Sequence, residues 1–143
     1  MNPHPGETGR MRHARILVAE DDLEMRRLVM EALHSDGHEA VDVSDGGQLL
    51  RHLTSLYRLR PDPEPIDMVV TDIRMPVCSG LEIVQGLRDA DWTTPVVIMT
   101  AFGDAHTRAQ AALLGAVLLD KPFKMITLRS IVRDLLQRSA QIH

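Results

Sequence analysis

Residues 66–76 read IDMVVTDIRMP, and this stretch decides the predicted fold. Met68, Val69 and Val70 form an apolar run that passes through Thr71 into a lone acid, Asp72. Apolar residues at consecutive positions are typical of a strand that is covered on both faces, as in a parallel sheet. Acids are common at strand ends without any chemical role, so Asp72 gains meaning only from the residues that can reach it.

Apolar runs of this kind alternate along the chain with segments whose apolar residues recur at helical spacing. We predict strands at residues 15–19, 39–43, 66–71, 95–99 and 116–119. Between and after them we predict helices at residues 25–36, which Gly37 ends, at 44–57 with Ser44 as the N-cap, at 79–87, at 104–114 and at 128–136. This strict alternation predicts an α/β fold with a parallel sheet, helices on both faces and right-handed crossovers.

Length and composition predict one globular domain. The chain has 143 residues, 44% of them hydrophobic and 25% charged, which is enough for one core. Its net charge of −4 argues against broad nucleic-acid binding. No apolar run approaches the roughly 20 residues of a membrane-spanning helix, and residues 1–15 lack the apolar stretch of a signal peptide. The single cysteine, Cys78, excludes an internal disulfide and permits a reducing compartment, so we expect a cytoplasmic protein.

Polar side chains follow the strands that we expect to be central. Glu20 and Asp21 follow the first strand and Asp72 the third, while Thr100 and Lys121 follow the fourth and fifth. Ligands of an open parallel sheet bind outside the carboxyl ends of its strands. Carboxylates gathered there repel one another unless some are protonated or a cation sits among them. Oxygen ligands alone favour a hard ion, and we predict Mg²⁺ rather than Ca²⁺.

The same strand ends predict a phosphoryl site. The ammonium group of Lys121 and the hydroxyl of Thr100 suit a dianionic phosphoryl group beside a metal ion. A carboxylate can act as the nucleophile and become an aspartyl phosphate, and Asp72 is the central candidate. Each of these residues alone is a weak signal, but their joint occurrence at four strand ends favours a site over chance.

Four motifs now carry a resemblance to a known family. They are ILVAEDD at 16–22, VVTDIRMPVCSGLEIV at 69–84, VVIMTAFGD at 96–104 and LLDKPF at 118–123. In order and spacing the sequence resembles the receiver domains of two-component response regulators, the CheY-like superfamily. The resemblance covers residues 14–138 and implies a single flavodoxin-like (βα)5 domain with strand order 2-1-3-4-5. We expect residues 1–13 to form a disordered tail and residues 139–143 a C-terminal tail.

The resemblance also implies a role for each site residue. Asp72 is the expected phosphoacceptor and a Mg²⁺ ligand. Asp21 is expected to bind the metal directly, Glu20 through water, and Arg74 through its backbone carbonyl. Asp22 follows the acidic pair and is expected to cap the first helix.

Two further residues complete the expected phosphoryl site. Thr100 is the expected switch hydroxyl, and Lys121 is the expected cation beside the phosphoryl group. The Lys121–Pro122 bond is expected to be cis.

The resemblance implies a phosphorelay function. Asp72 would take its phosphoryl group from a sensor histidine kinase or a histidine phosphotransfer protein and switch a surface that binds an unknown target protein. We expect no direct binding to nucleic acid or membrane, and no catalysis beyond the domain's own phosphorylation and dephosphorylation. We expect a free-standing regulator. Open alternatives are a pseudo-receiver that is not phosphorylated and a receiver fragment of a larger transcriptional regulator.

Two departures from the family pattern, and two rival functions, are relevant. Leu118 stands where most members have an aromatic residue, three positions before the lysine, which puts the usual aromatic switch in doubt. Arg74 is large and charged, and we expect it to hang over the site and affect hydrolysis of the acyl phosphate. Arg74 also counts against a phosphatase, which usually has a second acid there, and residues 20–22 would repel the phosphate of a flavin carrier.

The histidines are each expected at the surface, without ligand spacing: His4, His13, His34, His38, His52, His106 and His143.

Overall fold

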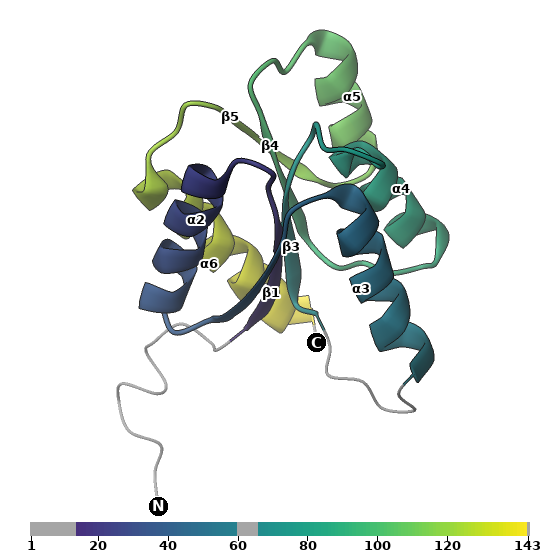
Figure 1. Ribbon diagram of the computed structural model, residues 1–143, viewed down its shortest axis with the longest axis horizontal. Coiled ribbons are helices and arrows are strands. Elements are labelled where there is room, and N and C mark those ends of the chain that lie inside the picture. Colours follow the sequence, from purple (N-terminus) through teal and green to yellow (C-terminus); the bar gives the residue numbers. More distant parts are fainter. Residues whose placement is uncertain (1–13, 60–65, 143) are drawn as a thin grey trace, which may run out of the picture.

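The computed structural model describes residues 14–59 and 66–142 (Figure 1). Its elements are β1 (Arg15–Ala19), α2 (Leu23–Ser35), β2 (Glu39–Val43), α3 (Gly46–Leu59), β3 (Met68–Asp72), α4 (Gly80–Asp89), β4 (Val96–Thr100), α5 (Ala105–Leu113), β5 (Val117–Asp120) and α6 (Met125–Ile142). The expected N-terminal tail at 1–13 lies outside the described residues, as do residues 60–65 before β3. No helix within the described ranges combines the length and apolar character needed to cross a membrane.

The five strands form one parallel sheet in the order β2-β1-β3-β4-β5. Helices α2 and α6 cover one face, and α3, α4 and α5 lie on the other (Figure 1). The predicted doubly wound α/β fold and its strand order are therefore confirmed.

The apolar runs are explained by two cores, one on each face of the sheet. Within β3, Met68 and Val70 belong to the core beneath α2 and α6, whereas Val69 belongs to the core beneath α3 and α4. All five residues of β3 and of β4 are buried. Central strands are apolar on both sides because successive side chains point to opposite faces, and each face is covered.

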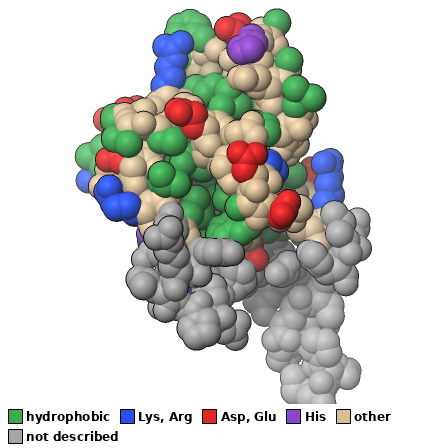
Figure 2. Space-filling view, turned by 90° about the vertical axis from the view of Figure 1, so that its right-hand side faces the viewer, with side chains coloured by type: hydrophobic (Ala, Val, Ile, Leu, Met, Phe, Trp, Pro, Cys, Tyr) green, Lys and Arg blue, Asp and Glu red, His purple; other side chains and the backbone are tan. Residues whose placement is uncertain are grey.

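The face formed by α3, α4 and α5 is partly apolar. Figure 2 views the molecule from this side and shows hydrophobic side chains among scattered charged ones. Exposed hydrophobic residues on this side include Leu50 of α3, Leu113 of α5 and Val77 in the loop before α4.

Several predicted boundaries were wrong by one or more residues. The strands β3, β4 and β5 continue into Asp72, Thr100 and Asp120, because these polar residues still pair with the neighbouring strand. Helix α6 continues to Ile142, into the expected C-terminal tail. Patterns of apolar residues locate an element, but pairing with a neighbour decides where it ends.

The predicted N-cap of α3 was also wrong. The helix begins at Gly46, and Asp45 caps it by accepting a hydrogen bond from the backbone N–H of Gln48 at 2.8 Å. The backbone N–H of Ser44 instead donates to Gln48 Oε1 at 3.0 Å. Both residues are common caps, and the turn after β2 places only Asp45 at the helix end.

One histidine departs from the expected surface location. His38 is 3% exposed, and its Nδ1 accepts a hydrogen bond from the backbone N–H of Ala14 at 3.2 Å. The turn between α2 and β2, with Gly37 at φ +85°, brings His38 over the start of β1. The short connection between α2 and β2 thus accounts for the burial of this imidazole.

Candidate functional site

The carboxyl ends of β1 and β3 place two acids side by side. Ala19 and Thr71 are paired in the register of these neighbouring strands, so the next residues, Glu20 and Asp72, meet at the edge of the sheet. Glu20 is 0% exposed and Asp72 is 8% exposed. Two carboxylates this deeply buried require compensating positive charge.

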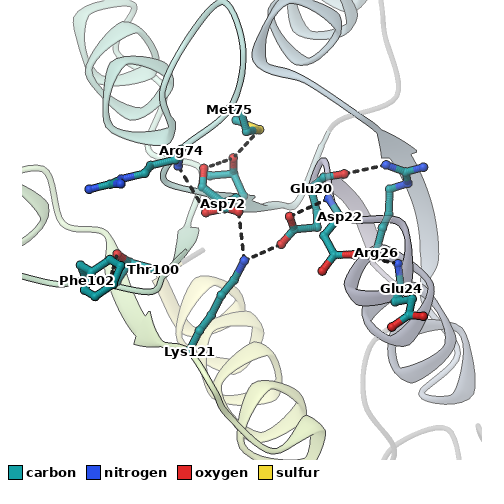
Figure 3. Close-up of polar contacts among 11 residues, drawn as sticks. Glu20, Asp22, Glu24, Arg26, Asp72, Arg74, Met75, Thr100, Phe102 and Lys121 are labelled. Atoms are coloured by element: carbon teal, nitrogen blue, oxygen red, sulfur yellow. Dashed lines mark hydrogen bonds and ion pairs between the residues drawn. The ribbon is translucent and has the colours of Figure 1, made fainter.

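Lys121 supplies that charge. Its Nζ lies 2.8 Å from Glu20 Oε1 and 3.0 Å from Asp72 Oδ2, bridging the two acids (Figure 3). The backbone N–H of Lys121 donates to the Thr100 carbonyl at 2.7 Å, which ties the loop after β5 to the end of β4. The Lys121–Pro122 bond is cis, as predicted. The structure therefore brings the predicted residues of β1, β3 and the loop after β5 into direct contact.

The pKa values of Glu20 and Lys121 are both raised, for different reasons. Burial raises the pKa of Glu20 to about 7, although the hydrogen bond from Lys121 acts to lower it. Burial alone would lower the pKa of Lys121, but its hydrogen bonds to Glu20 and Asp72 outweigh this effect and the pKa is raised. The lysine is therefore a permanent cation, and Glu20 is the group whose charge depends on a further positive partner.

The acidic side chains fit a hard cation. Glu20, Asp21 and Asp72 each offer a carboxylate oxygen, and these oxygens lie within 4.8 Å of one another. Asp21 is exposed, so one ligand faces solvent while the other two are buried. A set of oxygen ligands with room for water is the kind that Mg²⁺ prefers. The metal roles of these three residues stay predictions, as does that of the Arg74 carbonyl.

Two local features hold Asp72 in place. The backbone N–H of Arg74 donates to Asp72 Oδ1 at 3.2 Å, so the loop after β3 folds back onto its own acid. Helix α4 begins directly behind, where Ser79 and Glu82 form a capping box. A Cβ added to Gly80 would lie 2.7 Å from the Asp72 carbonyl oxygen, so glycine is required for this close approach.

Asp22 has its predicted capping role. Its side chain accepts a hydrogen bond from the backbone N–H of Glu24 at 3.1 Å, at the start of α2. The backbone N–H of Asp22 donates to Glu20 Oε2 at 3.1 Å. Asp22 thus both caps α2 and donates a hydrogen bond to the buried carboxylate of Glu20.

Thr100 lies on the strand beside Asp72. It is 1% exposed at the end of β4, one residue beyond the partner of Asp72 in the register. Its Oγ1 accepts a hydrogen bond from the backbone N–H of Phe102 at 3.2 Å. The hydroxyl therefore bonds to the loop that leads into α5, and its switch role stays a prediction.

The side chain of Arg74 does not hang over the site as expected. It points away from Asp72 and lies against Phe102, with the guanidinium carbon 5.8 Å from the ring centroid (Figure 3). Phe102 is 74% exposed, so the pair lies at the solvent-exposed edge of the site. Both residues come two positions after a site residue on neighbouring strands, and this shared spacing is the signal that could have predicted their contact.

Comparison with known proteins decides the family. The model for the response regulator receiver domain matches residues 16–133. The chain belongs to this family. The receiver domains of two-component systems share phosphorylation on aspartate and use of Mg²⁺ as general features.

Relatives of this receiver domain include longer transcriptional regulators. The chain is 38% identical to the transcriptional regulatory protein TctD of Salmonella typhimurium over 133 residues, and 36% identical to TcrA of Mycobacterium tuberculosis over 137 residues. These alignments cover 90% and 94% of the chain, but only 55% and 51% of the relatives. The chain thus spans about half the length of these curated relatives.

The fold of this receiver domain also matches solved structures. A response regulator receiver domain protein from Clostridium thermocellum superposes with a TM-score of 0.79 at 27% identity, over 91% of this chain and 99% of that one. The receiver domain of the Francisella response regulator 1452 gives a TM-score of 0.78 at 24% identity, over 89% and 99%.

Leu118, the departure from the family pattern, is part of the core in this receiver domain. It is half-buried on β5 and packs against the apolar cluster beneath α3 and α4. Two residues further along the strand, Asp120 forms an ion pair with Arg108 of α5, with Arg108 Nη2 at 2.8 Å from Asp120 Oδ1. The end of β5 is therefore held to α5 by charge.

One residue at the site of this receiver domain was missed from the sequence altogether. Arg26 of α2 donates from Nη1 to the Glu20 carbonyl oxygen at 2.7 Å (Figure 3). An arginine on an amphipathic helix carries no local signal that distinguishes it from a solvated residue. Only the packing of α2 against β1 and β2 places it at the acidic corner.

Proposed function

We propose that this receiver domain is phosphorylated on Asp72 in a Mg²⁺-dependent reaction, with a histidine kinase or a histidine phosphotransfer protein as the donor. The observation that supports this most strongly is the Lys121 ammonium, 2.8 Å from Glu20 and 3.0 Å from Asp72. This contact brings three strand ends to one point and leaves a buried carboxylate beside a fixed cation. Such a carboxylate suits attack on a phosphoryl group better than a structural role at a strand end.

The transfer is a displacement at phosphorus. A carboxylate oxygen of Asp72 forms a bond to phosphorus while the bond from phosphorus to the donor imidazole nitrogen breaks. The electron pair of that bond stays on the imidazole nitrogen. Lys121 offsets negative charge on the phosphoryl oxygens, and the N–H of Arg74 holds Asp72 in position for attack.

Glu20, Asp21 and Asp72 are the residues that would hold Mg²⁺. When bound, the ion neutralises charge on the phosphoryl oxygens and on the crowded carboxylates. Glu20 then takes part in its ionised form, which burial alone disfavours. We propose no catalysis by the domain beyond its own phosphorylation and dephosphorylation.

The output is a change in surface. Thr100 sits at the end of β4, bonded through its hydroxyl to Phe102 in the loop before α5. A phosphoryl group on Asp72 that draws this hydroxyl toward itself breaks that bond and moves the loop. Exposed apolar side chains, such as Phe102 in this loop and Leu113 at the other end of α5, offer a surface for a partner protein.

A second candidate is a receiver domain that forms part of a longer transcriptional regulator, in place of a free-standing protein. The coverage of about half of TctD and TcrA favours it. An antibody raised against this domain discriminates between the two in cells that produce it. A band near 16.0 kDa supports the free-standing regulator, whereas a longer polypeptide supports the fragment.

The phosphorylation itself is tested by intact mass. The protein is incubated with acetyl phosphate and Mg²⁺, beside Asp72→Asn as the matched control. Addition of one phosphoryl mass to the wild type alone supports the proposal. No addition to either form supports a pseudo-receiver, and addition to both places the acceptor elsewhere.

A further inference from the structure

Arg26 of α2 contacts the acidic corner after β1, which is the turn formed by Glu20 and Asp21. Arg26 Nη1 donates to the Glu20 carbonyl oxygen at 2.7 Å, and Arg26 Nε lies 3.2 Å from Asp42 Oδ2 on β2. The side chain of Arg26 is 17% exposed, whereas that of Asp42 is 49% exposed. Figure 3 shows the guanidinium on the far side of the corner from Lys121.

At this corner two consecutive residues, Glu20 and Asp21, direct their carboxylates to the same side. Neighbouring side chains of an extended strand point to opposite sides, yet the carboxylates of Glu20 and Asp21 both approach Asp72, within 4.8 Å. The chain must therefore turn between these two residues. The carbonyl that Arg26 binds belongs to the peptide that joins Glu20 to Asp21, and the plane of that peptide sets the direction of Asp21.

Other bonds hold Glu20 but not this peptide. The backbone N–H of Glu20 donates to the Val43 carbonyl at 3.2 Å, which continues the pairing of β1 with β2. Glu20 Oε1 and Oε2 accept from Lys121 and from the N–H of Asp22. Asp21 itself is exposed, so the orientation of its carboxylate depends on the backbone more than on packing.

We propose that Arg26 is a positioning residue for the metal site, and that it presents Asp21 to Mg²⁺ by fixing the peptide between Glu20 and Asp21. This inference rests on the proposed function in one respect, that Mg²⁺ is the cation of the site. A planar guanidinium held at two points by Asp42 and Glu20 fixes an orientation that a single ammonium does not.

A positioning role and a purely electrostatic role predict opposite changes in Mg²⁺ affinity when Arg26 is removed. Arg26 is a cation near three carboxylates, and by charge alone its removal strengthens the binding of a divalent cation. Loss of a positioning contact weakens that binding. The sign of the change in Mg²⁺ affinity therefore discriminates between the two roles.

The test is calorimetric titration of the full chain with Mg²⁺ alone, in the absence of any phosphodonor. Arg27→Ala is the matched control, because Arg27 is the next residue of α2 and its side chain is exposed. We expect Arg26→Ala to raise the Kd for Mg²⁺ by about tenfold, the lower end of the effect of an outer-shell partner. Arg27→Ala leaves the Kd unchanged or slightly lower, and Arg26→Lys gives an intermediate value.

A second readout separates positioning from a role in the transfer. With acetyl phosphate as donor, Arg26→Ala requires more Mg²⁺ for half-maximal phosphorylation, but at saturating Mg²⁺ its rate stays within about twofold of the wild type. A lower rate at saturating Mg²⁺ overturns the positioning role.

The remaining outcomes are equally decisive. An Arg26→Ala protein that binds Mg²⁺ as tightly as the wild type, or more tightly, shows that Arg26 acts only through its charge and overturns the inference. If Arg26→Ala fails to fold, Arg26→Lys compared with Arg27→Lys decides in the same way. If the wild type itself binds no Mg²⁺, the proposed function is wrong, and this result is distinct from a failure of the inference about Arg26 alone.

Discussion

Lys121 and Glu20 are 101 residues apart in the sequence, yet Lys121 Nζ lies 2.8 Å from Glu20 Oε1. Glu20 is fully buried, and the same ammonium contacts Asp72. One cation thus serves a predicted metal ligand and the predicted phosphoacceptor at once. We expect substitutions at this point to affect the proposed metal binding and phosphorylation differently, and the two effects can be measured separately.

Replacement of Lys121 by alanine is expected to move these two properties in opposite directions. The rate of phosphorylation by acetyl phosphate falls by about 100-fold, because a fixed charge that stabilises the transferring group is lost. The affinity for Mg²⁺ rises, because a competing cation is removed from Glu20 and Asp72. Initial rates from intact mass and calorimetric titration measure the two effects. A variant that loses both properties together indicates collapse of the site rather than loss of one charge.

The stability of the Mg²⁺-free protein is expected to depend on pH through Glu20. Its pKa is raised from 4.5 to about 7, so the folded state binds the proton more tightly than the unfolded state. Stability from this group is therefore present below pH 4.5 and is lost as the pH rises through 7. At 1.36 kcal/mol per pH unit the loss is up to about 3 kcal/mol.

Urea unfolding of the wild type and Glu20→Gln at about pH 5 and pH 7.5 measures this term, because glutamine does not titrate. The free energy of unfolding of the wild type falls relative to the variant between these two conditions. Added Mg²⁺ reduces the fall, since it favours the ionised carboxylate. A constant difference between the two proteins contradicts the raised pKa.

The contact of Arg74 with Phe102 is expected to affect the lifetime of the acyl phosphate. Both side chains lie beside the site rather than over Asp72, and we expect their contact to fix the loop after Asp72 and thereby the shielding of the acyl phosphate from water. Arg74→Ala and Phe102→Ala each shorten the lifetime by about two- to fivefold, in line with an exposed cation–π contact. Loss of the phosphoryl mass after removal of the donor gives the lifetime. The double variant is expected to show the same lifetime as the single variants. Unchanged lifetimes in all three variants would show that the contact of Arg74 with Phe102 does not affect hydrolysis of the acyl phosphate.

Two glycines of α4 are expected to respond oppositely to alanine. In Gly80→Ala the new Cβ lies 2.7 Å from the Asp72 carbonyl oxygen, which is backbone and cannot yield. This clash lowers the free energy of unfolding by about 1–3 kcal/mol. Gly86→Ala meets nothing within 4 Å and raises it by about 0.5–1 kcal/mol, because alanine is the better helix former.

Denaturant unfolding of both glycine variants provides the measurement, and each serves as the control of the other. The phosphorylation rate adds a second contrast, since of these two glycines only Gly80 packs against Asp72, the proposed phosphoacceptor. Equal stability changes would argue against close packing of α4 on the end of β3.

The architecture was predictable from the sequence because local patterns carry it. Consecutive apolar residues such as 68–70 require cover on both faces, and helical spacing between such runs supplies the cover. The site followed from the same pattern, since Asp72, Thr100 and Lys121 come where their strands end and parallel strands end at one edge. The motifs then indicated the family and its strand order.

Contacts between separate elements were decided only by the tertiary structure. Arg26 of α2 binds the Glu20 carbonyl, Arg74 lies against Phe102 rather than over Asp72, and His38 is buried over the start of β1. The contacts of Arg26 and His38 have no local signature, because each depends on how α2 packs across the sheet. The contact of Arg74 with Phe102 has only the shared two-residue spacing after Asp72 and Thr100 as its signal. Periodicity determines which face of an element is apolar, whereas the pairing of polar groups is settled when the faces meet.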